Sequence, residues 1–414
     1  MNAKLIAVGS ELLRFGRHDS NGDWITERLQ RLGVEVVGRA LVGDDHGRTA
    51  AEIGAAVDSA DIVVLTGGLG PTEDDRTREA LAQALGLALE RDDRRVARLR
   101  EFFDRRGKEF HPEQEKQADR PSGAVWIDNP LGIAPGILYR GESFLVIALP
   151  GVPAEMKRMF DDTVAPLIGQ AGEGRLARRV LKIGGRFESS VDAQVRDLYD
   201  TPGVEVTILT GAEGIELHLL ATADDAGQAR ARVDRLDREL AARLGLDLYG
   251  RDDETLAGII GRMLVQRGDS VATAESCTAG LLSATATAVA GSSCWFRGGL
   301  VVYSDDLKVS LAGVPPDILE ACGAVSEEVA RCLAQGARRR CGADYGVGIT
   351  GVAGPGGGTE EKPVGLVHVA IAEDDQRTEH WKIQQIGGRE LVRRRTVVFA
   401  LDRLRRALLR RDPA

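Results

Sequence analysis

The order of apolar and polar positions divides this chain into three stretches. Over the first 170 residues, short β-branched runs alternate with segments whose apolar positions repeat every three or four residues. This rhythm predicts βαβ units, a mostly parallel sheet and ligand-binding residues at the carboxyl ends of its strands. The predicted strands are 4–8, 34–41 and 61–66, and the predicted helices are 22–32, 48–59 and 77–85.

The rest of the chain has a different order of elements. The stretch 171–250 predicts a strand at 176–183, a helix at 187–198, a hairpin of 204–209 with 215–221, a helix at 226–244 and a linker at 248–253. Further on, an apolar strand at 298–302 precedes a helical pattern at 305–312. We therefore predict a multidomain α/β and α+β fold, with domains at 1–170, 171–250 and 251–414.

Composition places the chain among soluble globular proteins, with 43% hydrophobic and 28% charged residues. The net charge of −9 leaves no broad cationic surface, so nucleic-acid binding is not expected. No apolar run approaches the roughly 20 residues that cross a membrane, and the first residues lack a signal peptide's apolar core, so the expected location is the cytoplasm. The arginines near the end are expected on a solvated last helix: Arg403, Arg405, Arg406, Arg410 and Arg411.

The segment 291–308, GSSCWFRGGLVVYSDDLK, carries candidate catalytic residues. Tyr303 lies ten residues and Lys308 fifteen residues after Ser293, so a strand and a turn can bring the three together. A neutral lysine can accept the proton of an attacking serine where no histidine is at hand. Lys308 falls near the start of the predicted helix, whose positive end disfavours the ammonium form. The alternative interpretation is a capped helix with a solvated lysine and a structural tyrosine.

Two further features accompany this segment. Cys277, at a strand-to-helix turn, is either an alternative nucleophile or a small buried residue, and the lack of a nearby histidine favours burial. A glycine-dense loop after the apolar run 345–350 can direct several N–H groups onto a phosphate, with Lys362 as an added charge, or can be merely flexible. Its glycines are Gly351, Gly354, Gly356, Gly357 and Gly358.

Residues 254–410 resemble the C-terminal domain of the CinA (competence/damage-inducible) family, whose stand-alone relatives are nicotinamide mononucleotide deamidases. The matching pieces are ATAESCTAG (272–280), 291–308, LAGVPPDILEACGAVSEEVA (311–330) and GITGVAGPGGGTEEKPVG (348–365). The resemblance implies that Ser293 attacks the carboxamide carbon, that Lys308 takes its proton and that Tyr303 relays the proton or orients the lysine. The products are nicotinate mononucleotide and ammonia, and no cofactor is implied.

Around these residues the sequence indicates the rest of a substrate pocket. Gly291 allows close backbone approach, so N–H groups near Gly291 and Ser292 are candidate oxyanion donors. The remaining candidates, which shape or line the pocket, are Glu275, Ser276 and Thr278. The chain departs from the family where relatives commonly read TGG and GDR: it has Thr278-Ala279-Gly280 and Gly387-Gly388-Arg389.

A second candidate site follows the predicted strand 61–66, in TGGLGPTEDD. Gly67, Gly68 and Gly70 let the backbone approach a phosphate, and Asp74 with Asp75 can hold a divalent cation that bridges it. The alternative is a glycine turn followed by an acidic helix N-terminus, which the helix dipole favours in any case.

Residues 1–170 resemble the molybdopterin-binding-like domain of CinA proteins, through VGSELL, LVGDD, LTGGLGPTEDDRTREAL, NPLGIAPG and LPGVPAEMKRMF. This resemblance implies metal-dependent hydrolysis of the ADP-ribose pyrophosphate. It implies Asp44, Asp74 and Asp75 as metal ligands, Thr72 with the three glycines as phosphate contacts, and Asn21 and Glu155 in the pocket. Phe15 and Gly16 replace the family's usual glycine and aspartate, and Ile133 replaces a common threonine, which puts this activity in doubt.

The middle stretch resembles the KH-like domain of CinA proteins. Its G-x-x-G, Gly211 to Gly214, falls in the predicted hairpin turn with an acidic residue, which is not typical of an RNA clamp. A spacer or dimerisation role is expected instead, and a homodimer with it. The sequence thus predicts a pyridine-nucleotide salvage enzyme that binds nicotinamide mononucleotide and, by its N-terminal domain, ADP-ribose. The alternative is a catalytically silent nucleotide-binding or scaffold protein.

Overall fold

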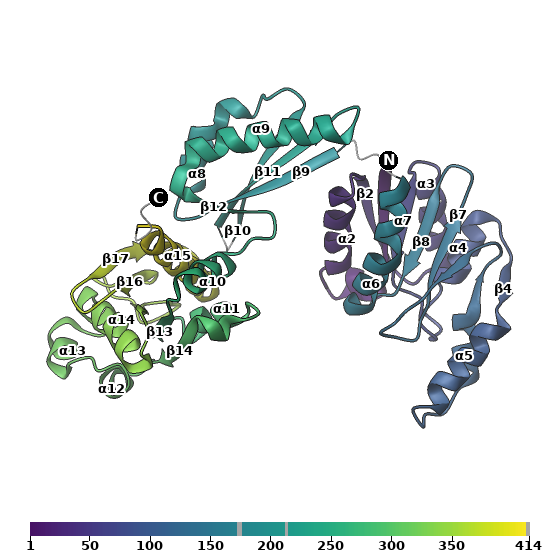
Figure 1. Cartoon of the computed structure of the whole chain (residues 1–414). Coiled ribbons are helices and arrows are strands. Elements are labelled where there is room, and N and C mark those ends of the chain that lie inside the picture. Colours follow the sequence, from purple (N-terminus) through teal and green to yellow (C-terminus); the bar gives the residue numbers. More distant parts are fainter. Residues whose placement is uncertain (172–175, 212–213, 411–414) are drawn as a thin grey trace. The chain divides into compact units, whose positions relative to one another are not determined.

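The structure, a computed structural model, describes residues 1–171, 176–211 and 214–410 (Figure 1). The chain forms two compact units, one of residues 1–178 with 220–233 and the other of residues 179–219 with 234–414. Three α/β or α+β modules make up these units, as the sequence predicted, and each has its own sheet.

The N-terminal module is built on a six-stranded sheet of order β2-β1-β3-β8-β7-β6. Strands β2, β1, β3 and β8 run parallel, while β7 and β6 are antiparallel, so the prediction of a mostly parallel sheet is confirmed. The carboxyl ends of β1, β3 and β8 lead into the loops that carry the second candidate site. The strands are β1 (Asn2–Val8), β2 (Glu35–Val42), β3 (Ile62–Thr66), β6 (Val125–Ile127), β7 (Gly136–Arg140) and β8 (Leu145–Leu149).

Helices cover both faces of this sheet (Figure 1). Ile25 and Leu29 of α2 pack on one face with Met156 and Met159 of α6, and Ile53 of α3 packs on the other face with α4. Helices α2 and α3 begin at side-chain caps, since Asp19 accepts from the N–H of Gly22 and Asp45 from that of Arg48. They are α1 (Ser10–Arg14), α2 (Ser20–Arg31), α3 (His46–Val57), α4 (Thr77–Leu85), α6 (Pro153–Met159) and α7 (Ala165–Ala171), with a π turn at Phe160–Val164 between the last two.

An insertion that the sequence pattern did not predict separates α4 from β6. It holds a small two-stranded sheet and one amphipathic helix, in the order β4 (Leu89–Arg91), α5 (Asp93–Asp104), a 3-10 helix (Pro112–Ala118) and β5 (Asp119–Pro121). Three-residue strands are too short for their period to stand out from loop sequence.

The middle module has an antiparallel sheet of order β10-β11-β9-β12 with two helices. The predicted linker at 248–253 is wrong in its first part, because β12 pairs with β9 and forms the fourth strand. This pairing satisfies backbone N–H and C=O groups of β9 that would otherwise lie unpaired at the edge of the sheet. Such pairing depends on a strand distant in the chain, so the local sequence does not reveal it. The elements are β9 (Leu176–Ile183), α8 (Glu188–Val195), β10 (Val204–Gly211), β11 (Gly214–Thr222), α9 (Ala226–Leu244) and β12 (Leu248–Arg251). Ala212 and Glu213 of the G-x-x-G lie outside the described residues.

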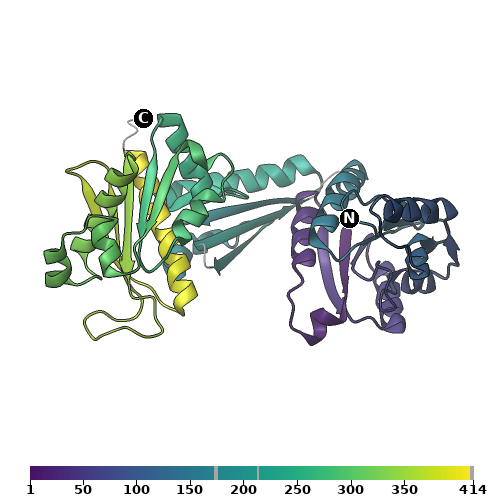
Figure 2. The ribbon, with the colours of Figure 1, turned by 90° about the horizontal axis from the view of Figure 1, so that it is seen from below.

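The C-terminal module has a five-stranded sheet of order β14-β13-β15-β16-β17, whose first three strands are parallel. Helix α14 packs on one face through Leu333, and α10, α11 and α15 pack on the other around Trp295 (Figure 2). The strands are β13 (Val271–Glu275), β14 (Phe296–Val301), β15 (Tyr345–Gly351), β16 (Leu366–Ala372) and β17 (Thr378–Gln384). The helices are α10 (Leu256–Arg267), α11 (Leu281–Thr287), α12 (Asp305–Ser310), α13 (Pro316–Cys322), α14 (Glu327–Cys341) and α15 (Arg389–Arg410).

The expectation of a solvated last helix is wrong for α15. Asp402 is fully buried and pairs with Arg405 and Arg406, each with a nitrogen 2.7 Å from its carboxylate. Arg406 also pairs with Asp247 of the middle module, and Arg405 donates to the carbonyl of Leu246. The helix therefore contacts the middle module through the partly buried Arg406–Asp247 ion pair and the Arg405 hydrogen bond. Arg411 lies outside the described residues.

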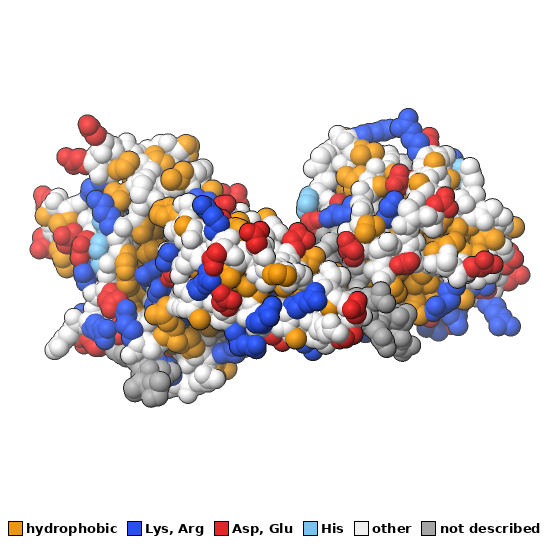
Figure 3. All heavy atoms as spheres, turned by 90° about the horizontal axis from the view of Figure 1, so that it is seen from above, with side chains coloured by type: hydrophobic (Ala, Val, Ile, Leu, Met, Phe, Trp, Pro, Cys, Tyr) orange, Lys and Arg blue, Asp and Glu red, His pale blue; other side chains and the backbone are white. Residues whose placement is uncertain are grey.

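Charges of both signs alternate across the surface drawn in Figure 3. In the part of the chain that the structure describes, no helix is long and apolar enough to cross a membrane.

Candidate functional site

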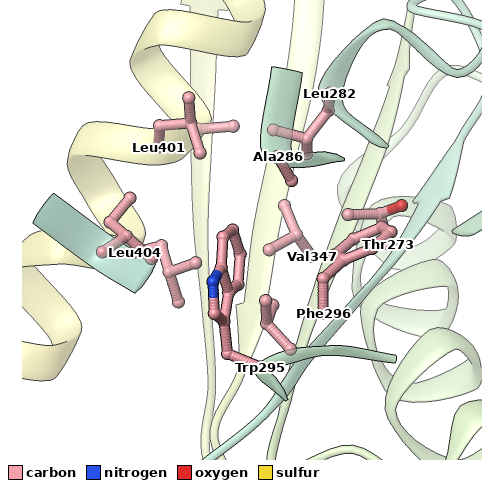
Figure 4. A pocket seen from close by; sticks show the side chains of 11 residues that line it. Thr273, Leu282, Ala286, Trp295, Phe296, Val347, Leu401 and Leu404 are labelled. Atoms are coloured by element: carbon pink, nitrogen blue, oxygen red, sulfur yellow. The ribbon is translucent and has the colours of Figure 1, made fainter. Parts of the chain in front are cut away.

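The segment that carries Ser293 is fixed by its neighbour Trp295. Gly291 has a φ of 79° and precedes a short 3-10 helix, Ser292–Cys294. Trp295 then inserts its ring into the core beside Leu404, Leu282 and Val347 (Figure 4). The void left around these side chains is only about 10 Å³, near the smallest volume that holds a water molecule, so the ring is closely packed. Ser293 itself is exposed.

Lys308 is the most unusual residue of this region, because its side chain is only 2% exposed. Its Nζ lies 3.2 Å from the carbonyl oxygen of Tyr303 and 3.0 Å from Oδ1 of Asp305. The alternative of a solvated lysine is therefore wrong. The two contacts agree with the rule that a lysine is almost never fully buried unless it has a partner. Tyr303, by contrast, is 57% exposed and is not a core residue.

Among the described residues, Ser293 makes no side-chain hydrogen bond to Tyr303 or Lys308. The structure thus joins Tyr303 to Lys308 directly, and it leaves Ser293 on the exposed turn before β14, the strand that leads to both residues.

Arg389 was not recognised as a site residue from the sequence. It donates to the hydroxyl of Tyr303 at 3.3 Å and to the carbonyl of Gly354 at 2.8 Å, so it links the catalytic tyrosine candidate to the glycine loop. One turn further along α15, Arg393 donates to the carbonyl of Thr278 at 2.6 Å. The sequence pointed to this segment only through its departure from the family, Gly387-Gly388-Arg389. The tertiary fold alone brings the start of α15 to these loops.

The turn after β13 is held by Glu275, which is fully buried. Its carboxylate accepts hydrogen bonds from the N–H groups of Gly280, Leu282 and Ser283 at 2.8 to 3.0 Å. Glu275 therefore caps α11 and does not present its charge to a ligand. Ser276 and Thr278 are also buried, and the hydroxyl of Thr278 has no hydrogen-bond partner among the described residues.

Ala279 of this turn adopts a left-handed backbone with φ of 49°. This conformation costs a residue with a Cβ roughly 1 kcal/mol or more. The sequence departure from the family glycine thus introduces local strain next to Thr278.

Cys277 does not qualify as the alternative nucleophile. The thiol is 4% exposed, and burial raises its pKa to about 11. Only the thiolate attacks carbonyls efficiently, so burial leaves Cys277 in its unreactive form at neutral pH.

The glycine loop divides into packed and open parts. A Cβ on Gly351 would lie 2.7 Å from the carbonyl oxygen of Leu366, so that glycine is required by sheet packing. Gly356 and Gly357 face open space, and a ligand can approach them. Gly354 packs against Val364, and Lys362 donates to the carbonyl of Cys322 at 2.8 Å, which places its charge beside α13.

A buried histidine pair lies on the face of the sheet that α14 covers. Nδ1 of His368 and Nε2 of His380 are 2.9 Å apart, and Nδ1 of His380 lies 3.1 Å from Glu327. Burial, with His380 as the next cause, lowers the pKa of His368 to about 4, and burial also lowers the pKa of His380. Both rings are thus neutral at pH 7.

This pair predicts an acid-sensitive core. The unfolded chain binds a proton at its ordinary pKa of about 6.5, whereas folded His368 binds it only near 4, so stability is complete above 6.5 and is lost as the pH falls toward 4. Between pH 7 and pH 4.5 the wild type should therefore lose about 2–3 kcal/mol of unfolding free energy that His368→Gln, which has no imidazole to protonate, does not lose. Urea unfolding of both proteins at pH 7 and at pH 4.5 measures these free energies. The same difference between variant and wild type at both pH values would contradict the prediction.

The N-terminal candidate loop is folded tightly onto its own scaffold. A Cβ on Gly67 would lie 2.2 Å from the carbonyl oxygen of Val8, and one on Gly68 would lie 2.2 Å from Oγ1 of Thr77. Behind the loop, Arg78 is 1% exposed and donates to the carbonyls of Leu69 and Gly70. Burial lowers the pKa of Arg78 to about 10, so it remains a cation behind the loop at neutral pH, a feature that sequence reasoning missed.

The three aspartates do not form a metal site. Asp75 accepts from the N–H and hydroxyl of Thr72, and Asp44 accepts from the N–H of Ser10. Asp74 is exposed. Across residues 1–171, 176–211 and 214–410, no three His, Cys, Asp or Glu side chains are grouped to hold a metal ion. The three carboxylates thus do not fit the implied cation, because they do not meet at one point and because Asp75 already binds Thr72 and Asp44 binds Ser10.

The other N-terminal candidates are placed as follows. Asn21 is 8% exposed and donates to the carbonyl of Gly151 at 2.8 Å, while its Oδ1 is buried without a partner in the described chain. Glu155 accepts from Asn129 at 2.6 Å. A Cβ on Gly70 would lie 2.3 Å from Asp75, and Phe15 is 77% exposed, so its ring does not fill the pocket.

Comparison with known proteins adds three family matches in chain order. They are a probable molybdopterin binding domain over residues 4–170, a damage-inducible protein CinA KH domain over 178–250 and a CinA C-terminal domain over 253–408. The CinA-like protein of Acidobacterium capsulatum is 43% identical and covers 99% of this chain and 100% of its own length. That of Rippkaea orientalis is 41% identical with the same coverage. A solved structure, competence/damage inducible protein CihA from Agrobacterium tumefaciens, is 42% identical over 37% of this chain and 93% of that chain, with a TM-score of 0.36.

Proposed function

The chain belongs to the CinA family, and from this premise we propose that its C-terminal module hydrolyses the carboxamide of nicotinamide mononucleotide. The observation that best supports the proposal is Lys308, a fully buried amine fifteen residues after Ser293 and in contact with the Tyr303 backbone. Burying a lysine costs free energy, and such residues commonly serve catalysis.

In the proposed reaction, Ser293 Oγ forms a bond to the carboxamide carbon as Lys308 takes its proton. The carbon–nitrogen bond then breaks, and Lys308 returns the proton to the departing ammonia. Water hydrolyses the resulting ester and releases nicotinate mononucleotide. This step uses the neutral amine form of Lys308, and it requires Nζ, which lies 3.0 Å from Oδ1 of the exposed Asp305, to turn toward the Ser293 hydroxyl.

Other residues of the site bind and orient the substrate. Arg389 fixes the Tyr303 hydroxyl and the glycine loop relative to each other. The backbone N–H groups of Gly356 and Gly357, whose Cβ positions face open space, receive the 5′-phosphate. We do not assign the N-terminal module a pyrophosphatase activity, because Asp44, Asp74 and Asp75 do not meet at one metal site.

Ammonia release tests the proposal most directly. The purified chain should release ammonia from nicotinamide mononucleotide and do so at least about tenfold less efficiently from nicotinamide riboside, which lacks the phosphate. Folded protein that binds the mononucleotide without releasing ammonia would support the alternative of a silent nucleotide-binding protein.

A further inference from the structure

A second pocket of the C-terminal unit lies apart from Ser293, Tyr303 and Lys308. Its volume is about 350 Å³, and residues of β9, β12, α10, α11 and α15 line it. Small-ligand sites commonly occupy about 300–1,000 Å³ and favour such junctions between modules.

The walls of this pocket are mostly apolar. Tyr249 of β12, Leu256 of α10, Leu281 of α11 and Leu401 of α15 contribute to it. Such walls suit an aromatic or aliphatic ligand body, because binding removes apolar area from water. Ala288 and Val289 complete one side, just before the turn that carries Ser293, so the pocket adjoins the nucleophile segment without including it.

Three charged side chains border the pocket, and two of them are already neutralised. Glu254 pairs with Arg262, and Arg394 pairs with Glu390 at 2.8 Å. The side chain of Lys182 of β9, by contrast, makes no hydrogen bond or ion pair with the residues that the structure describes. The pocket therefore presents one unpaired positive charge beside apolar walls.

We propose that this pocket binds an amphipathic anion, with an apolar aromatic or aliphatic body and one acidic group that pairs with Lys182. The assignment does not depend on the proposed deamidase, since none of its residues belongs to that machinery.

Two fluorescent probes that differ only in their acidic group test the proposal. 8-Anilino-1-naphthalenesulfonate carries a sulfonate, and N-phenyl-1-naphthylamine is the same molecule without it. The full-length protein should bind the sulfonate probe at one site. Lys182→Gln should weaken that binding about tenfold and leave the neutral probe unchanged, because only the charge-assisted contact is lost.

A filling variant locates the site independently of charge. Ala288→Trp places an indole at the pocket wall and should abolish binding of both probes, whereas Ala284→Trp, an exposed position of α11 outside the pocket, should not. Equal effects of the two tryptophans, or unchanged sulfonate binding in Lys182→Gln, would overturn the proposal.

A different outcome would also overturn it. If probe binding disappears as the protein concentration rises, and if Ala288→Trp changes the oligomeric state, a second copy of the chain fills the pocket instead.

Discussion

Replacing Ser293 by alanine is expected to lower ammonia release from nicotinamide mononucleotide by at least about 10³-fold, because the hydroxyl that forms the ester intermediate is removed. The serine is exposed on a short turn, so removal of its hydroxyl should leave the fold and substrate binding intact. Kinetics of ammonia release together with calorimetric titration of the nucleotide would separate loss of chemistry from loss of binding.

Two cysteine variants complete this test. Cys294→Ala alters the exposed neighbour of Ser293 and should retain activity. Cys277→Ala should also retain most activity, because the buried thiol has a pKa of about 11. Full activity in Ser293→Ala with loss in Cys277→Ala would transfer the nucleophile to the cysteine.

Replacing Asp402 by alanine is expected to lower the free energy of unfolding of the C-terminal unit by about 3–5 kcal/mol. The carboxylate is fully buried and faces Arg403, Arg405 and Arg406. Its removal leaves the buried Arg405 without a carboxylate partner, whereas Arg406 keeps Asp247. Urea unfolding followed by the fluorescence of Trp295 and Trp381, in a protein whose Trp24 and Trp126 are replaced by phenylalanine, would measure the change.

Asp375 supplies a matched control for Asp402. It also contacts two arginines, Arg338 and Arg339, but its side chain is 66% exposed. Exposed ion pairs stabilise folds little, so Asp375→Ala should shift the unfolding midpoint far less. Similar shifts of the midpoint for the two variants would contradict the prediction, because burial of Asp402 would then add no stability beyond that of an exposed ion pair.

The sequence predicted the alternating elements of the N-terminal module because amphipathic period and strand composition are local properties. It failed at β12 and at the insertion between α4 and β6, where short strands are stabilised only by partners distant in the chain. It also failed at α15, since helical spacing of arginines does not reveal that Asp402 is buried among them.

For the candidate site, the sequence by itself determined the residue types and their spacing: Ser293, Tyr303 and Lys308 on one strand-turn-helix segment. The tertiary structure alone decided their environments. It buried Lys308, brought Arg389 from the far end of the chain onto Tyr303, directed the Glu275 carboxylate inward to cap a helix and left Asp44, Asp74 and Asp75 without a common centre. Burial and charge pairing depend on which distant segments pack together, and this is settled by the whole fold and not by any local stretch of sequence.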